Sequence, residues 1–227
     1  MARAVKQPLG AVRGRVGDVI FRYMNGKRFI SVYNADVKIS MSEKSVANRN
    51  KFGAAIRFAK AVNSVSDLKK VWDYSNAPGR SAYTKIYKEN NKRIHPDYLS
   101  LLCTITPHGI GYLLDSFNLD TKFATVKIKI DRTHEQNLIP PYTAHFVVFL
   151  SDPLNPESDS FTNYAFTSVR VEEETPDEYQ TITSKFISPD SQLMLLYKKA
   201  TAFFAVTKTD SKPFEWLNTC SQEFIIG

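Results

Sequence analysis

From residue 98 onward the chain consists of short apolar runs of strand length, separated by turn-forming clusters such as DPLNPESDS and KTDSKP. In the clearest run, FATVKIKID, every second residue is apolar and faces the same way: Ala124, Val126, Ile128 and Ile130. The other expected strands lie at residues 99–105, 142–150, 163–171, 179–186, 193–196, 201–207 and 221–226. About seven or eight short strands at this spacing are typical of an antiparallel β-sandwich of the immunoglobulin-like type.

The chain before residue 98 has a different pattern, which begins with a β-hairpin signal. Two alternating apolar stretches flank Asn25 and Gly26, and both residues tolerate the positive φ of a two-residue turn. We interpret the glycines upstream as bends or bulges, because a dinucleotide-binding loop needs G-x-G-x-x-G between a strand and a helix. These glycines are Gly10, Gly14 and Gly17.

Three stretches between the hairpin and residue 98 have the period of an amphipathic helix. The spacing predicts helices over residues 43–63, 67–74 and 81–94, and the proline at position 96 ends the third. Ser42 and Ser66 are the expected N-caps of the first two. The buried face of the first helix is expected to carry Phe52, Ala55, Ile56, Ala59 and Val62, whereas Lys85 is expected on the exposed face of the third.

The fold class that follows is α+β, in two modules. A β-hairpin plus two or three helices is expected to occupy residues 1–97, and an antiparallel immunoglobulin-like β-sandwich to occupy residues 98–227.

Charge is distributed unevenly along the chain. Residues 1–100 hold 20 basic and 7 acidic side chains, a net charge of +13, and residues 101–227 hold 10 and 16, a net charge of −6. Clustered Lys and Arg attract phosphate backbones without reading sequence, although basic residues on helices also commonly form a solvated face. The same charges allow a basic module of one copy to meet an acidic module of another, and head-to-tail contacts of that kind build rings or filaments. Candidate residues for contact with nucleic acid or a protein partner are Arg13, Arg15, Arg22, Lys27, Arg28, Arg49, Lys51 and Arg57.

Motifs for catalysis are absent from the sequence, which contains no G-x-S-x-G, no G-K-[ST] phosphate loop and no H-E-x-x-H. We therefore expect a non-enzymatic protein without a cofactor or a metal site. Cys103 and Cys220 are expected to be reduced, since no export signal precedes them. No run is long enough for a membrane helix. The expected location is the cytoplasm, or a virion if a phage encodes the protein.

The N-terminal quarter of the chain combines a glycine-spaced basic start, a Gly-Lys turn and an Arg-x-Lys-Phe helix, at Gly10, Gly14, Arg15, Gly17, Gly26, Lys27, Arg49, Lys51 and Phe52. At these positions it resembles a family of uncharacterised Bacteroidota proteins of unknown function. The resemblance implies a shared architecture and a bacterial or phage origin. It implies no activity, so no functional residue is carried over.

Two functions remain open at this point. The first is a structural or assembly protein that acts through protein contacts, for example in a phage particle or another multi-copy assembly. The alternative is a nucleic-acid-binding protein that uses the basic N-terminal half.

Overall fold

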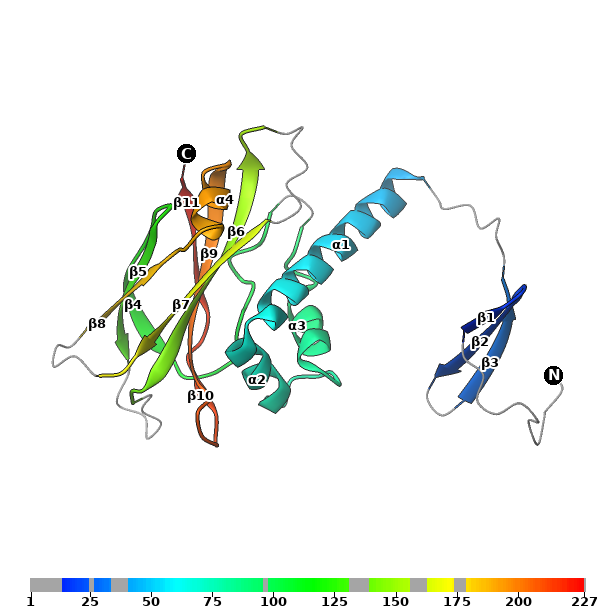
Figure 1. Ribbon diagram of the computed structural model, residues 1–227, viewed down its shortest axis with the longest axis horizontal. Helices are drawn as coiled ribbons and strands as arrows, with labels where there is room; N and C mark the ends of the chain where they lie inside the picture. The colour runs from blue at the N-terminus through cyan, green and yellow to red at the C-terminus, as the bar shows by residue number, and fades with distance from the viewer. Residues whose placement is uncertain are drawn as a thin grey trace. The chain divides into compact units, whose positions relative to one another are not determined.

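The computed structural model describes residues 14–24, 27–33, 41–95, 98–130, 139–155, 163–173 and 179–226. The chain divides into two compact units, Met1–Ser45 (unit 1) and Val46–Gly227 (unit 2). The elements of each unit are labelled in Figure 1.

Unit 1 contains a three-stranded antiparallel sheet in the order β1 (Gly14–Val16), β2 (Val19–Met24) and β3 (Lys27–Val32). Met24 pairs with Lys27, so the predicted hairpin is confirmed, while its turn residues and Gly10 lie outside the described part of the chain. Gly17, with a φ of 57°, occupies the tight turn between β1 and β2. A side chain is strained at that φ, which explains a glycine at this bend.

Unit 2 combines helices with two antiparallel sheets, and its elements follow one another along the chain. They are α1 (Glu43–Ser64, which begins just before the unit boundary), α2 (Ser66–Tyr74), α3 (Ala82–Asn90), β4 (Tyr112–Leu119), β5 (Phe123–Ile130), β6 (Tyr142–Pro153), β7 (Tyr164–Val171), β8 (Gln180–Lys185), α4 (Asp190–Met194), β9 (Tyr197–Lys208), β10 (Glu215–Trp216) and β11 (Cys220–Ile225). The α+β class and the β-rich C-terminal half are therefore as predicted.

The two sheets of unit 2 face each other across a hydrophobic core (Figure 1). The larger sheet has the order β10-β9-β6-β7, with β11 also paired to β9, and the smaller has the order β4-β5-β8. Phe117 and Val126 of the smaller sheet share the core with Phe146 and Phe204 of the larger one. The alternating apolar side chains of β5 point into this core, as the sequence pattern predicted for Val126 and Ile128.

The other face of the larger sheet packs against the helices in a second core. Phe58 of α1 contacts Phe203 of β9 with 5.8 Å between ring centroids, and Trp72 and Val147 belong to the same cluster. Successive side chains of a strand point to opposite faces, so β6 and β9 are apolar along their length because both faces are covered. Helices and sheets thus share cores, and the expected boundary between residues 97 and 98 falls inside unit 2.

Some expected elements differ from those observed. Residues 193–196 were expected as a strand, but Leu193 lies in helix α4, which begins after Pro189, a residue favoured at helix starts. The run 99–105 makes only an isolated bridge from Leu99 to Ile94. Leu99, Cys103 and Ile105 belong to the helix-side core, whereas Leu101 and Leu102 are exposed. Strand β4 was not expected, because its alternation is interrupted by a bulge between Leu114 and Ser116.

The predicted helices are present, with corrections at their ends and faces. Val65, rather than Ser66, is the N-cap of α2, and α3 ends at Asn90 rather than residue 94. Phe52 was expected in the core but is 54% exposed, since it lies on the rim of the buried face.

Lys85 was expected outside and is buried instead. Its Nζ donates hydrogen bonds to the carbonyl oxygens of Trp72 (2.9 Å), Asp73 (2.9 Å) and Ser75 (2.7 Å) at the end of α2. Those carbonyls have no partner within their own helix, and a cation at a helix C-terminus is favourable. The lysine therefore caps α2 from the neighbouring helix.

Candidate functional site

The eight predicted contact residues are divided between the two units. Arg15, Arg22, Lys27 and Arg28 lie on the sheet of unit 1, and Arg13 lies outside the described residues. The other three lie on α1: Arg49, Lys51 and Arg57. On a helix of 3.6 residues per turn, Lys51 points away from the side that Arg49 and Arg57 share. The residues of α1 therefore form no single stripe.

The register of unit 1 separates its side chains into two unlike faces. Val16, Val19 and Val32 are cross-strand neighbours, as are Phe21 and Ile30, and side chains opposite one another share a face. We call this the apolar face: Val16, Val19, Phe21, Ile30 and Val32. Arg28 lies on the same side of β3 as Ile30 and Val32. The opposite face, the basic face, carries Arg15, Ile20, Arg22, Lys27, Phe29 and Ser31.

The apolar face is uncovered within the described part of the chain. The side chains of Val16, Ile30 and Val32 are 60%, 66% and 78% exposed, and every residue of β3 is exposed. A three-stranded sheet is near the lower limit of size for independent stability in water, and small domains bury a small fraction of their surface. Contiguous exposed apolar patches are typical of protein contact sites.

Arg15 contacts Tyr33 and Gly17 at one edge of the basic face. Its guanidinium carbon lies 3.6 Å from the centre of the Tyr33 ring, and its Nε donates to the carbonyl oxygen of Gly17 at 2.8 Å. A cation over an aromatic ring is stabilising by about 0.5–1 kcal/mol at an exposed site. Tyr33 is thus held beside the arginine.

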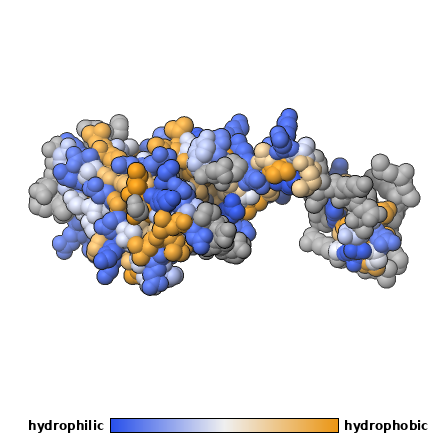
Figure 2. All heavy atoms as spheres, turned by 90° about the horizontal axis from the view of Figure 1, so that it is seen from above, coloured by the Kyte–Doolittle hydropathy of each residue, from blue (hydrophilic) through white to orange (hydrophobic). Residues whose placement is uncertain are grey.

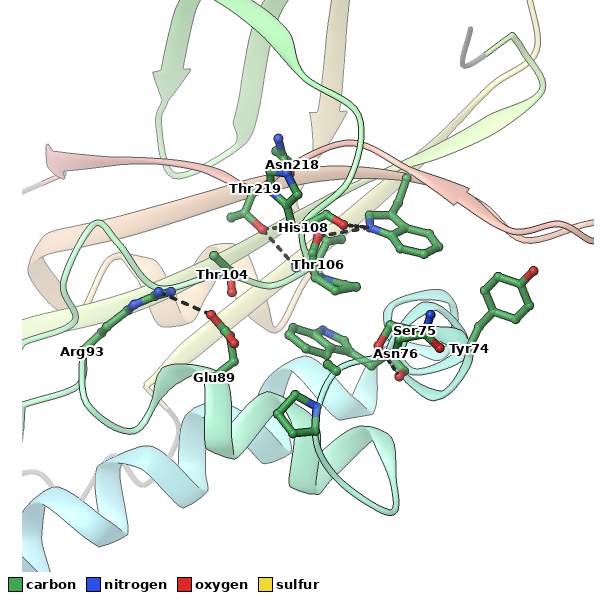
Figure 3. A pocket seen from close by; sticks show the side chains of 15 residues that line it. Tyr74, Ser75, Asn76, Glu89, Arg93, Thr104, Thr106, His108, Asn218 and Thr219 are labelled. Carbon is green, nitrogen blue, oxygen red and sulfur yellow. Dashed lines mark hydrogen bonds and ion pairs between the residues drawn. The ribbon is translucent and has the colours of Figure 1, made fainter. Parts of the chain in front are cut away.

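Unit 2 contains a groove of about 770 Å³ between the end of α2 and the segments around residues 104–108 and 216–219. We call it the aromatic groove, because Trp72, Tyr74 and Trp216 line it. Figure 3 shows Thr106 and His108 on one side of it, and Tyr74, Ser75 and Asn76 on the other.

Hydrogen bonds fix the β-sheet side of the groove. The Thr219 hydroxyl accepts from the backbone amides of Ile105 (2.9 Å) and Thr106 (3.0 Å), and Asn218 Oδ1 accepts from the amide of Gly109 (2.7 Å). Trp216 Nε1 donates to the carbonyl oxygen of Pro107 at 3.0 Å. A Cβ on Gly109 would collide with the Trp216 ring, so this close approach requires glycine.

The helical side of the groove is equally fixed. Trp72 is fully buried, and its Nε1 donates to the carbonyl oxygen of Ile105 at 2.8 Å. The Lys85 cap holds the carbonyls that end α2. Both walls therefore have a defined shape without a ligand.

Charge in the groove is balanced by one ion pair. Arg93 Nη2 lies 3.3 Å from Glu89 Oε1, and Arg93 Nη1 donates to the carbonyl oxygen of Leu102 (Figure 3). Glu89 and Arg93 are the only Asp, Glu, Lys or Arg residues among those that line it. The wall is thus polar, and the opposite charges of Glu89 and Arg93 cancel.

A buried histidine forms the other notable polar cluster of unit 2. His145 Nδ1 shares a hydrogen bond with the Ser168 hydroxyl and Nε2 with the Thr207 hydroxyl, both at 2.9 Å. Burial lowers the pKa of His145 to about 4, although the Asp67 carboxylate opposes this. An imidazole with so low a pKa is a weak base towards a serine hydroxyl. The cluster therefore joins β6, β7 and β9 rather than activating Ser168.

Apolar side chains also reach the surface of unit 2 (Figure 2). Tyr98, Phe224 and Ile225 line a groove of about 530 Å³, and Ile225 is 82% exposed. Asp152 and Glu223 line the same groove, and we call it the acidic-rimmed groove. Asp152 has a φ of 58°, a left-handed conformation uncommon for a residue with a side chain.

Metal ligands, cysteine thiols and membrane-spanning helices are the remaining features of interest among the described residues. Among the described residues, no three His, Cys, Asp or Glu side chains gather as a metal site would require. Cys103 and Cys220 are free, and burial raises the pKa of each thiol to about 11. No described helix is both long and apolar enough to cross a membrane.

The chain matches no family model and no curated protein. Among solved structures it is similar to two crystal structures of a β-glucosidase from Kluyveromyces marxianus, one in complex with glucose, each at 13% identity and a TM-score of 0.23. The matches cover 62% and 65% of this chain but only 16% and 17% of the β-glucosidase. The chain thus spans less than a fifth of that enzyme's length, and a TM-score this low supports no statement about fold or activity.

Proposed function

We propose that the protein is a non-enzymatic component of a multi-copy assembly, such as a phage particle, and that unit 1 is its docking element. The exposed apolar face of unit 1 carries this proposal. Burying apolar area stabilises an interface by about 25 cal/mol per Å². Docking of this face therefore supplies the core that unit 1 lacks.

The occupant of the apolar face in this proposal is unit 2 of a second copy. Residues 1–45 carry nine Lys and Arg against three Asp and Glu. Unit 2 as a whole is nearly neutral, with 21 Lys and Arg against 20 Asp and Glu, but its residues 101–227 have a net charge of −6. Two copies of unit 1 would repel one another, so the negative charge of residues 101–227 favours a head-to-tail contact. A head-to-tail contact repeats, which suits a ring or filament.

The acidic-rimmed groove is the receiving surface that we propose. Tyr98 and Ile225 offer apolar area, while Asp152 and Glu223 offer negative charge to Arg28, which shares the side of the apolar face. Lys199 offsets part of that charge, since it lies 3.9 Å from Asp152. Apolar contact at the centre with opposite charges around it is the common anatomy of a protein interface.

Unit 2 serves as the scaffold, and we propose that its sheets form an immunoglobulin-like sandwich. Counted from β4 with the two-residue β10 left out, the strand orders are first-second-fifth in one sheet and seventh-sixth-third-fourth in the other, so that β11 is the seventh. Greek-key connections of this kind support the immunoglobulin-like assignment. Domains of this architecture are common in cell-surface and other interaction proteins.

Sedimentation velocity of the full chain at low salt, over a range of concentrations, tests the assembly. The variant Ile30→Asp places a charge on the apolar face, and Ser31→Asp places the same charge on the basic face next to it. We expect the unaltered chain and Ser31→Asp to assemble as concentration rises, and Ile30→Asp to remain monomeric. Assembly should weaken as salt rises, because screening reduces the charge contribution.

Two results would refute this function. One is a monomer at every concentration and salt level. The other is equal assembly by Ile30→Asp and the unaltered chain, which would show that the apolar face is not the contact.

The basic face supports a second candidate function, nucleic-acid binding. Arg15, Arg22 and Lys27 share that face with Phe29, which is 48% exposed and available for base stacking. Fluorescence anisotropy with a single-stranded oligonucleotide tests it: affinity should fall steeply with salt and with Arg22→Glu. Binding that is insensitive to both changes would exclude this function.

A further inference from the structure

We propose that the aromatic groove of unit 2 binds a neutral carbohydrate, either a monosaccharide or a short oligosaccharide. None of the residues that line the aromatic groove lines the acidic-rimmed groove of the proposed assembly contact. The size, rigidity, aromatic content and charge balance of the aromatic groove support a carbohydrate as its ligand.

The groove has the size and the fixed shape of a ligand site. Its volume of about 770 Å³ lies within the range of roughly 300–1,000 Å³ found for small-molecule sites. Both walls are anchored by hydrogen bonds, from Thr219 on one side and from Trp72 on the other. Little conformational entropy is therefore lost when a ligand enters.

Aromatic rings provide one end of the groove with surfaces for the C–H faces of a sugar ring. Tyr74 and Trp216 lie 6.4 Å apart with their planes at 85°, so they form a corner rather than two parallel plates. Phe214 supports the Tyr74 ring from 5.1 Å, and Tyr74 is itself 45% exposed. Because Tyr74 and Trp216 contact each other edge to face, they leave no parallel gap for a flat aromatic ligand, whereas the exposed part of the Tyr74 ring offers a surface for the C–H face of a sugar.

The polar groups of the groove favour a ligand without charge. Glu89 and Arg93 neutralise one another, so neither an anion nor a cation finds an uncompensated partner. Together with Asn76 and His108 they supply both donors and acceptors. Sugar hydroxyl groups donate and accept, and a wall of this mixed kind matches them.

The two tryptophans of the chain provide a direct test, since Trp72 and Trp216 both line the groove. Tryptophan emission of the full chain is titrated with glucose, galactose, mannose, N-acetylglucosamine and their β-1,4-linked disaccharides, up to about 50 mM. Saturation-transfer NMR on the same samples identifies the sugar protons in contact. We expect saturable binding to at least one sugar, with a Kd near or below about 1 mM.

Variants locate the binding. Tyr74→Ala removes an aromatic surface and should weaken binding at least tenfold, and Glu89→Gln should weaken it several-fold while preserving the shape of the side chain. Tyr98→Ala is the matched control, because Tyr98 is a similarly exposed tyrosine that lines the other groove. It should leave the affinity unchanged.

The proposal is overturned if no sugar gives a saturable change, or if Tyr74→Ala and Glu89→Gln both bind as well as the unaltered chain. Saturable binding of adenosine, inorganic phosphate or a proline-rich peptide with none of the sugars would also overturn it, since the ligand class would be different.

Discussion

Strands β3 and β9 are both strands rich in apolar residues, yet their surroundings are opposite. All six residues of β3 are exposed, whereas β9 is buried along nearly its whole length, between the smaller sheet on one side and the helices on the other. Apolar residues thus indicate a strand in both units, but they do not identify which part of the same or another molecule covers it. The cover of β9 is intramolecular, and the proposed cover of β3 is another molecule.

The two units therefore have different roles in the proposed assembly. Unit 2 encloses two cores and keeps its shape through internal contacts, which allows it to hold a defined groove. The described strands of unit 1 expose their apolar residues, and in the proposed assembly a partner covers them and stabilises the unit. The same kind of substitution should therefore change the free energy of unfolding by different amounts in the two units.

The largest expected difference comes from removing one phenylalanine in each unit. Phe203 is fully buried against Phe58, so Phe203→Ala should lower the free energy of unfolding of unit 2 by about 3–5 kcal/mol. Phe29 is 48% exposed, and Phe29→Ala should change the free energy of unfolding of unit 1 by less than about 0.5 kcal/mol. Urea unfolding measures the first loss through tryptophan emission, because both tryptophans lie in unit 2, and amide hydrogen exchange of the strands of unit 1 measures the second. Comparable losses in the two variants would contradict the comparison.

A smaller effect is expected from acid. Since the pKa of buried His145 is lowered to about 4, the unfolded chain takes up a proton near pH 6.5, before the folded chain does. The stability of unit 2 should therefore be intact above about pH 6.5 and should fall as the pH drops to 4, by about 3 kcal/mol in all. Urea unfolding at a series of pH values measures the loss.

The histidine variants isolate this contribution. His145→Gln should flatten the decline between pH 6.5 and 4, whereas His108→Gln, at an exposed position, should preserve it. Residues 1–45 contain no histidine, so unit 1 should show no such dependence in this range. An equally steep decline in His145→Gln would assign the acid sensitivity to other groups.

Local signals in the sequence predicted local structure well. Asn25 and Gly26 predicted the hairpin, and the helical period predicted α1 to within one residue at its end. These features depend on neighbours in the chain, and turn residues and periodicity encode them directly.

Features that depend on distant partners were missed. Lys85 was assigned to a solvated face because its three carbonyl partners, at the end of α2, cannot be recognised from its own helix. A module boundary was predicted near residue 98. The continuous apolar run 144–150 in β6, which indicates a strand covered on both faces, was not used in that prediction. That run already implied that something besides the smaller sheet must cover it.

The aromatic groove was also beyond the sequence analysis. Tyr74 and Trp216 are far apart in the chain, and only the folding of β10 beside residues 107–110 brings them together. The one available signal was the presence of just two tryptophans, which sequence spacing alone does not relate to each other.

Amide hydrogen exchange of the full chain, followed by mass spectrometry at a dilute and a concentrated protein level in low salt, tests the central contrast most directly. At the dilute level, residues 14–33 should exchange close to the unprotected rate while β6 and β9 are strongly protected. At the concentrated level, residues 14–33 should gain protection and β6 and β9 should not change. Residues 14–33 as strongly protected as β6 and β9 in the dilute sample would contradict the account, because unit 1 would then be stable without a partner.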